Sequence, residues 1–249
     1  MNGDRWDVMN NLKIYFWFSA LIWTVAVGAS LAWNVYQARS TALEAAFIQA
    51  RVGFEKDVLY RRWNATMHKV YVPVSDIVQP NPYLLVPNRE LSCGPGMKLT
   101  MVNPAYMTRM VHGMQGDGIK AVGHITSLKP LNPENDPDQW ERSALEQLAA
   151  NRNMEEVTAV EARRTSEVVR LMRPLRVEAP CMECHQAQGY KIGDIRGGIS
   201  SLAPLQFSYW NRQVMGLVIG HAFLWFMSIA GMLLFLRLLL SSVSRNQSG

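Results

Sequence analysis

Two long apolar stretches near the ends of the chain restrict its fold more than any other feature. The first runs from Ile14 to Tyr36 and the second from Val214 to Leu236. A helix needs about twenty apolar residues to cross a bilayer, and both stretches reach that length. The predicted boundaries are a tail at residues 1–13, transmembrane helices at 14–36 and 212–239, one domain at 37–211 between them, and a tail at 240–249.

The first apolar stretch is interpreted as an uncleaved anchor rather than a secretory signal peptide. Its apolar run is longer than that of a usual signal, and Tyr36-Gln37-Ala38-Arg39 is a poor cleavage site. Arg5 and Lys13 flank the first stretch, while Arg237 and Arg245 flank the second. Because Lys and Arg accumulate on the cytoplasmic side of membrane spans, both tails are predicted to be cytoplasmic.

Composition excludes some classes of function. The chain has 25 Lys and Arg against 20 Asp and Glu, and its formal charge is +5. These basic residues form no block, so nucleic acid is not a predicted partner. Membrane lipid is a predicted partner because of the two apolar stretches. No Ser-His-Asp arrangement, paired-carboxylate motif or Gly-rich phosphate loop stands out, so the chain is not predicted to be an enzyme.

The central segment contains the sequence Cys181-Met182-Glu183-Cys184-His185. This is the C-x-x-C-H pattern of covalent c-type haem attachment. A zinc site would need two further ligands, and Cys93 is the only other cysteine. A redox dithiol would need a βαβ context, which the surrounding sequence lacks. We therefore predict one haem c held by Cys181 and Cys184, with His185 as its proximal axial ligand.

Covalent haem also predicts the location of the domain. Haem c is attached outside the bacterial cytoplasm, so the domain is predicted to lie in the periplasm, anchored in the bacterial inner membrane. The charges that flank the two apolar stretches predict the same orientation.

The distal haem ligand has several candidates. We rank Cys93 first, because a thiolate is a strong iron ligand, and His68 second, with an open or water-occupied site as a third option. For Cys93 the alternative is an inert loop thiol, and for His68 it is a hydrogen-bonded structural histidine. Weaker candidates are Met97, Met107, His112 and His124.

Other polar residues near the motif or in the spans have alternative roles. One or two arginines are expected to pair with the haem propionates and the others to be solvated. His221 lies inside the second apolar stretch, where we expect a hydrogen bond to a neighbouring helix rather than a second haem. The arginines near the motif are Arg163, Arg164, Arg170, Arg173, Arg176 and Arg196.

Local patterns predict an α+β domain with an antiparallel sheet. The first span should continue as a helix to about Val58, and the proline-rich residues 73–95 should form an irregular loop. Asn103-Pro104 is a helix start, and a capping box is read at Asp136 to Gln139 ahead of another helix. The expected strands are residues 122–128, 157–162, 168–177 and 195–202.

Several segments resemble one bacterial family. They are residues 63–73, 80–84, 99–109, 123–130, 173–175 and 189–200, including Asn103-Pro104-Ala105-Tyr106-Met107 and Gly197-Gly198-Ile199-Ser200. The chain from about residue 40 to 205 is similar to the single-haem c-type, PAS-like sensor domains of membrane sensor kinases and cyclases. The resemblance implies a PAS-like antiparallel sheet with flanking helices, held between the two transmembrane helices.

The chain departs from this family at two places. Where the family often has His-Gly-Gly-Val-Tyr, this sequence has His68-Lys69-Val70-Tyr71. Family members commonly continue into a HAMP, kinase or cyclase module, whereas residues 240–249 are all that follow the second span here. The resemblance across the domain favours a sensor of redox state or of a diatomic gas that relays to a partner membrane protein, and two spans with a PAS-like domain favour a homodimer. The short tail and the double anchor favour the alternative, a one-electron carrier or cytochrome subunit of a larger membrane complex.

Overall fold

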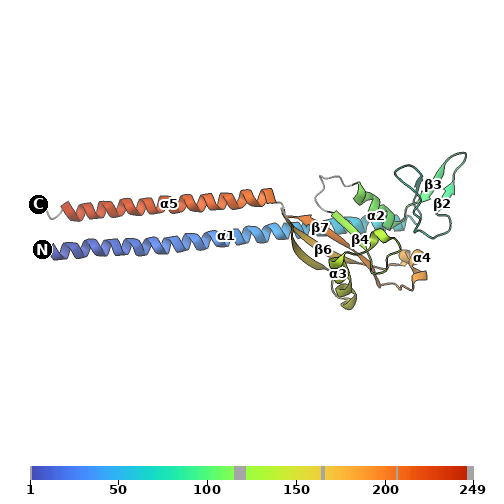
Figure 1. Ribbon diagram of the computed structural model, residues 1–249, viewed down its shortest axis with the longest axis horizontal. Helices are drawn as coiled ribbons and strands as arrows, with labels where there is room; N and C mark the ends of the chain where they lie inside the picture. Colours follow the sequence, from blue (N-terminus) through green and yellow to red (C-terminus); the bar gives the residue numbers. More distant parts are fainter. Residues whose placement is uncertain (1, 115–121, 164–165, 206, 246–249) are drawn as a thin grey trace. The chain divides into compact units, whose positions relative to one another are not determined.

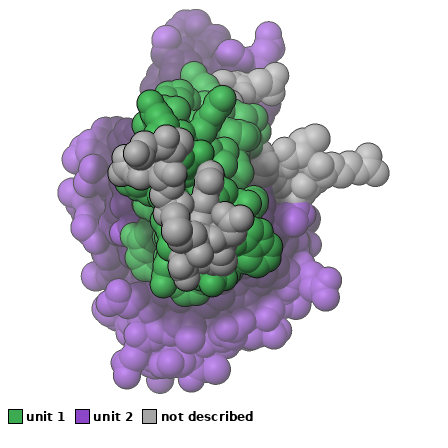
Figure 2. Space-filling view, turned by 90° about the vertical axis from the view of Figure 1, so that its left-hand side faces the viewer, with its two compact units in different colours: residues 1–42, 206–249 green, residues 43–205 purple. Residues whose placement is uncertain are grey.

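The computed structural model describes residues 2–114, 122–163, 166–205 and 207–245. The chain divides into two compact units, which Figure 2 colours separately. Unit 1 comprises residues 1–42 and 206–249, and unit 2 comprises residues 43–205. Helix α1 (Asn2–Thr66) begins in unit 1 and ends in unit 2, as the predicted continuation of the first span requires.

Unit 1 pairs the first part of α1 with α5 (Phe207–Arg245) (Figure 1). Both helices are long and apolar enough to cross a membrane, by length and composition. Polar side chains join them: Trp225 Nε1 donates to Thr24 Oγ1 at 2.9 Å, and His221 Nε2 lies 3.2 Å from Ser30 Oγ. The hydrogen bond expected of His221 is therefore present. Such contacts between apolar helices are each worth about 0.6 kcal/mol.

Unit 2 is built on a four-stranded antiparallel sheet in the order β4-β7-β6-β5. Its central pair runs from Val168 opposite Pro204 to Arg176 opposite Ile195, with a register shift between Leu175 and Arg176. The predicted α+β class with an antiparallel sheet is confirmed, and all four predicted strands exist. Their bounds are β4 Val122–Thr126, β5 Val157–Arg163, β6 Ser166–Arg176 and β7 Ile195–Pro204.

A second, smaller sheet includes one strand, β2, from within residues 73–95, which were predicted to form a loop. Its order is β1-β3-β2, and all pairs are antiparallel. The prediction of an entirely irregular segment was wrong because strands this short carry too little alternation to be recognised. The proline-rich residues between β1 and β2 do remain outside regular elements. The bounds are β1 Tyr71–Pro73, β2 Glu90–Ser92 and β3 Lys98–Met101.

Two helices in unit 2 begin with side-chain caps. The Asn103 side chain accepts a hydrogen bond from the Tyr106 N–H at the start of α2 (Pro104–Gly113), as predicted. For α3 (Gln139–Ala150) the capping box is formed by Asp138 and Glu141, so the box read at Asp136 and Gln139 was wrong. The preceding Pro133–Asn135 forms its own short helix, η1, which shifts the cap by two residues. Helix α3 buries Ala144, Leu145 and Leu148 against Met172 of the sheet.

Helix α1 packs on the sheet through an apolar cluster and a set of ion pairs. Phe54 of α1 joins Ile125 and Ile199 in a buried cluster. Beside it, Arg51 donates to both carboxylate oxygens of Glu156, and Arg173 of β6 pairs with Glu55 at 2.7 Å and with Glu156 at 3.0 Å. These contacts fix α1 relative to the strands that follow it in the chain.

The sheet and α3 enclose a charged network around Glu141. This carboxylate is 2% exposed and lies 3.0 Å from His124 Nδ1, while Ser200 Oγ also donates to it. Arg170 approaches Glu141 at 3.4 Å and is held by Asp138 at 2.7 Å, with its guanidinium over the Trp140 ring. The hydrogen bond to Glu141 raises the pKa of His124. Burial alone would raise the pKa of Glu141, but its hydrogen bonds, first that from His124, lower it.

The stability of unit 2 should depend on pH through His124. Its folded pKa is raised above the ordinary 6.5, so the stability it contributes is complete below about pH 6.5 and is lost as the pH rises through the folded value. The pKa of Glu141 is lowered from its ordinary 4.5, so the stability that Glu141 contributes is complete above pH 4.5 and is lost as the pH falls through the folded value. We expect His124→Gln to lower the melting temperature most between these limits, and least at alkaline pH where His124 is neutral in the folded protein too, measured by thermal denaturation. Equal destabilisation at every pH would contradict the assignment. The charged groups around His124 are Glu141, Asp138 and Arg170.

Candidate functional site

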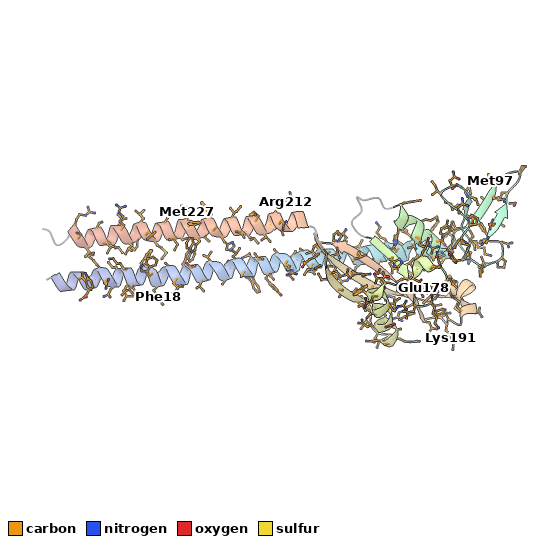
Figure 3. The ribbon with its side chains drawn as sticks, viewed as in Figure 1. Phe18, Met97, Glu178, Lys191, Arg212 and Met227 are labelled. Carbon is orange, nitrogen blue, oxygen red and sulfur yellow. The ribbon has the colours of Figure 1, made fainter. Side chains whose placement is uncertain are left out.

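The C-x-x-C-H sequence lies in a chain of three short helices between β6 and β7. Figure 3 labels Glu178 and Lys191, which precede and follow it. The Glu178 carbonyl accepts from the Cys181 N–H at 2.9 Å, and the left-handed Gly189 (φ 82°) ends the last helix. The Gly193 N–H then bonds the Val177 carbonyl at 2.8 Å, which closes the segment on itself. The helices are η2 Ala179–Cys181, α4 Met182–His185 and η3 Gln186–Gln188.

Cys181 and His185 line one cleft with an empty volume of about 550 Å³. Its walls come from α1, α2, the end of β4, the end of β6 and the start of β7. The sequence motif and residues far from it in the chain therefore meet at one place. The other lining residues are Arg61, Ala105, Ile125, Thr126, Ser127, Pro130, Asn135, Leu175, Arg176, Val177, Arg196 and Gly197.

The cleft belongs to a row of cavities along the end of α1. A second cavity of about 550 Å³ shares Arg61 and Cys181 with the first. A third, of about 1010 Å³, shares Ala65 and Pro180 with the second and reaches His68. The space beside Cys181 thus extends from the neighbourhood of His185 toward His68.

The His185 imidazole is oriented through one ring nitrogen. Nδ1 lies 2.7 Å from Gln188 Oε1, and Arg196 Nε approaches the same nitrogen at 3.4 Å. In a neutral ring with hydrogen on Nδ1, this nitrogen donates to Gln188, and the longer approach of Arg196 is then a contact rather than a hydrogen bond. The described residues give Nε2 no hydrogen-bond partner. Burial is the main cause that lowers the pKa of His185 and so favours this neutral form. A neutral imidazole with one nitrogen anchored and the other free is the form that ligates a metal.

Three arginines give the cleft a positive lining. Arg61 comes from α1, Arg176 from the end of β6 and Arg196 from β7. Burial lowers the pKa of Arg61 to about 10, and burial also lowers the pKa of Arg196. Among the described residues no ion pair joins either guanidinium to a carboxylate. Asp57, whose charge acts on Arg61, pairs with His112 at 2.9 Å instead.

The two candidate distal ligands do not line this cleft. Cys93 is exposed, and its N–H bonds the Met97 carbonyl at 2.9 Å in the turn between β2 and β3. Figure 3 shows Met97 well separated from Glu178 and Lys191. His68 has a left-handed backbone (φ 61°), which is a strained conformation for a residue with a side chain, and it lines the third cavity. Both assignments stay predictions.

The other candidate residues have local roles or lie outside the description. His112 Nε2 pairs with Asp57 at 2.9 Å, and His124 is held by Glu141. The Cys184 side chain lies outside the described part of the structure. Among the described residues, no cluster of three or more His, Cys, Asp or Glu side chains is placed to hold a metal ion. His185 is thus the one strong metal ligand that the described residues bring to the cleft, beside the Cys181 thiol.

Sequence reasoning missed two residues of the site. Gln188 follows the motif and orients His185. Arg61 lies on α1, distant from the motif in sequence, but one signal was available. It follows Phe54 and Val58 at helical spacing, so a charged residue sits on the apolar face of the helix. A charge in such a position needs a partner or a ligand.

A comparison with protein-family models identifies the domain. The Tll0287-like model matches residues 39–204. The chain belongs to the Tll0287-like family. The matched residues of this Tll0287-like domain include every strand of both sheets, the C-x-x-C-H sequence and all residues that line the cleft. Neither the curated proteins nor the solved structures gave a match.

Gly197 is required for the shape of the cleft. A Cβ atom at this position would overlap the Thr126 carbonyl oxygen and lie 3.2 Å from Ser127 Cβ. Gly197→Ala must therefore push β7 away from the chain that follows β4. We expect a loss of about 1–3 kcal/mol of unfolding free energy in urea denaturation.

The matched control is Gly53→Ala in the interior of α1. A Cβ atom at Gly53 meets nothing within 4 Å, so the helix should be unchanged or more stable by about 0.5–1 kcal/mol. If both variants were equally stable, the close approach at Gly197 would not limit the structure.

Proposed function

We propose that this chain is a membrane-anchored c-type cytochrome domain that senses redox state or a diatomic gas from the periplasm. The observation that carries the proposal is the position of Cys181 and His185, which belong to one C-x-x-C-H sequence and line one cleft. The proposal includes one haem, bound covalently through Cys181 and Cys184, and no enzymatic reaction. Its location is the bacterial inner membrane, where the two apolar helices anchor it.

The residues of the cleft suit a haem. His185 has its Nε2 free for iron and its Nδ1 held by Gln188. The cleft walls combine apolar side chains with polar and cationic ones, and the row of cavities along α1 gives room for a macrocycle beside the Cys181 thiol. The polar lining is cationic, which matches the two haem carboxylates. A bound haem would supply an iron atom that changes oxidation state and coordinates a diatomic gas. The apolar wall residues are Ala105, Ile125, Leu175 and Val177.

Helix α1 provides a physical route for a signal. It contributes Arg61 to the cleft and Phe54 to the sheet core, and the predicted first span belongs to the same helix. A change at the cleft that shifts Arg61 therefore acts on α1 directly. We propose that a partner membrane protein receives this shift, and that two copies of the chain associate so that their α1 helices respond together.

A second candidate function is one-electron transfer within a membrane complex. The observation that favours it is the exposure of Glu178, Ala179 and Pro180, the residues just before Cys181. A haem attached here would have an edge close to solvent, where a redox partner can approach. This function requires a six-coordinate haem that does not exchange ligands, whereas gas sensing requires a labile or open sixth position.

Covalent attachment can be tested by substitution. We expect the double variant Cys181→Ser with Cys184→Ser to lose haem staining on a denaturing gel, because no thiol remains at the attachment site. The control is Cys93→Ser, whose thiol is exposed in a turn and outside the cleft, and which should keep full staining. Full staining of the double variant would disprove the proposed attachment.

Optical spectra separate gas sensing from electron transfer. We expect the dithionite-reduced protein to take up CO with a shifted Soret band, because the described lining of the cleft offers no second His, Cys or Met besides His185 and Cys181. A reduced spectrum unchanged by CO and NO would exclude gas sensing. Cys93→Ala and His68→Ala are measured in parallel to identify the distal ligand. If one of these variants alters the spectrum of the oxidised protein, the replaced residue is the distal ligand.

A further inference from the structure

The arginines of unit 2 differ in how they are paired. Away from the cleft, several pair with a carboxylate within 3.3 Å. These are Arg51, Arg62, Arg89, Arg109, Arg152, Arg170 and Arg173. Within the described residues, no ion pair joins Arg61, Arg176 or Arg196 to a carboxylate, and these three line the cleft together. Positive charge is therefore left without a partner at the site.

Arg61 and Arg196 are the two cations that depend on the cleft for a partner. Arg61 has one weak hydrogen bond, from its Nη1 to Thr108 Oγ1 at 3.5 Å. Arg196 donates to Ser127 Oγ and lies over the Tyr190 ring at 5.1 Å. Arg196 Nε also lies 3.4 Å from His185 Nδ1, and Asp57, whose charge acts on Arg61, is already paired with His112. Hydroxyls, an imidazole and a ring face leave much of a guanidinium charge uncompensated. Arg176 differs, because its side chain is exposed and donates to the Arg152 carbonyl at 2.6 Å.

We propose that Arg61 and Arg196 bind the two propionate carboxylates of the haem, and that Arg61 thereby links the cofactor to helix α1. This inference rests on the proposed haem site. A guanidinium presents two parallel N–H donors to a carboxylate, and such bidentate pairs are short and strong in partly buried sites. Two cations from different elements, α1 and β7, match two carboxylates on one edge of a macrocycle. Free phosphate or chloride could neutralise the same charges, and the experiment below distinguishes these sources.

The pairing has a redox consequence. Oxidation of the iron adds one positive charge to the haem. If each propionate is neutralised by an arginine, removing that arginine leaves a negative charge close to the iron, and the ferric state gains stability. The midpoint potential should therefore fall when Arg61 or Arg196 is replaced.

The test compares Arg61→Gln and Arg196→Gln with two matched variants in the full-length protein. Arg62→Gln removes the next cation of α1, which pairs with Glu178 at 3.3 Å outside the cleft. Arg176→Gln removes a cation that lines the cleft but donates to a backbone carbonyl. Redox titration should give a clear fall in potential for Arg61→Gln and Arg196→Gln, and a smaller one for both controls. Arg61→Lys, which keeps the charge, should recover most of the potential.

Several outcomes would overturn the inference. Equal falls for Arg176→Gln and Arg61→Gln would show a general charge effect rather than propionate binding. Unchanged midpoint potentials in Arg61→Gln and Arg196→Gln would show that these two arginines do not bind the propionates. A wild-type potential that shifts with added phosphate or chloride at constant ionic strength would assign the cations to a free anion. Haem staining of the wild-type protein and of each variant separates this test from that of the proposed function. Wild-type protein without covalent haem would refute the proposed function, whereas the potentials test only the propionate partners. Circular dichroism confirms that each variant is folded, and if Arg61→Gln is not, Arg61→Lys and Arg196→Gln carry the comparison.

Discussion

The packing of α1 against the four-stranded sheet is the interaction on which the rest of unit 2 depends. Phe54, Ile125 and Ile199 bring together a helix, the first strand and the last strand of the main sheet, and burial of each such side chain is worth about 1.5–3 kcal/mol. The ion pairs of Arg173 with Glu55 and Glu156 then set the position of the helix along the sheet. Only with α1 in this position does Arg61 reach the cleft that holds Cys181 and His185.

Charged side chains are paired in one part of unit 2 and lack ion pairs in another. Around Glu141, a buried carboxylate meets His124 and Arg170, so the cost of burying ions is offset by hydrogen bonds of opposite charge. At the cleft, no ion pair joins Arg61 or Arg196 to a carboxylate among the described residues, and Asp57, whose charge acts on Arg61, is paired with His112. This contrast is the reason why we propose an external anion, the haem propionates, as the partner of Arg61 and Arg196. This contrast says more about the site than the cavity volume does.

Regular elements with strong local signals could be predicted from the sequence, and contacts between distant segments could not. The Asn103 cap could be predicted from its side-chain chemistry, because an amide side chain just before a proline is a common helix start. The strand Ile195–Pro204 was also predicted, although it is buried along most of its length and shows no alternation. Strands β1 to β3 are too short for alternation to appear, and the capping box of α3 was misplaced because Asp136 and Asp138 are both good caps. At the site, the C-x-x-C-H residues are close together in the sequence, so the motif could be recognised from the sequence alone. The approach of Arg61 depends on how α1 packs, which no local pattern contains.

The position of Arg61 also links the two properties that the sequence predicted separately, a membrane anchor and a cofactor site. Phe54 and Arg61 are seven residues apart on α1, about two helical turns, and so lie on one face of the helix. The first contacts the sheet core and the second lines the cleft. The packed core around Phe54 therefore resists a displacement of Arg61 at the cleft. Because a helix is stiff, a displacement that does occur moves α1 as a rigid body. We propose that this connection serves sensing, because a sensor must couple its cofactor to the membrane helix, whereas an electron carrier can function without that coupling.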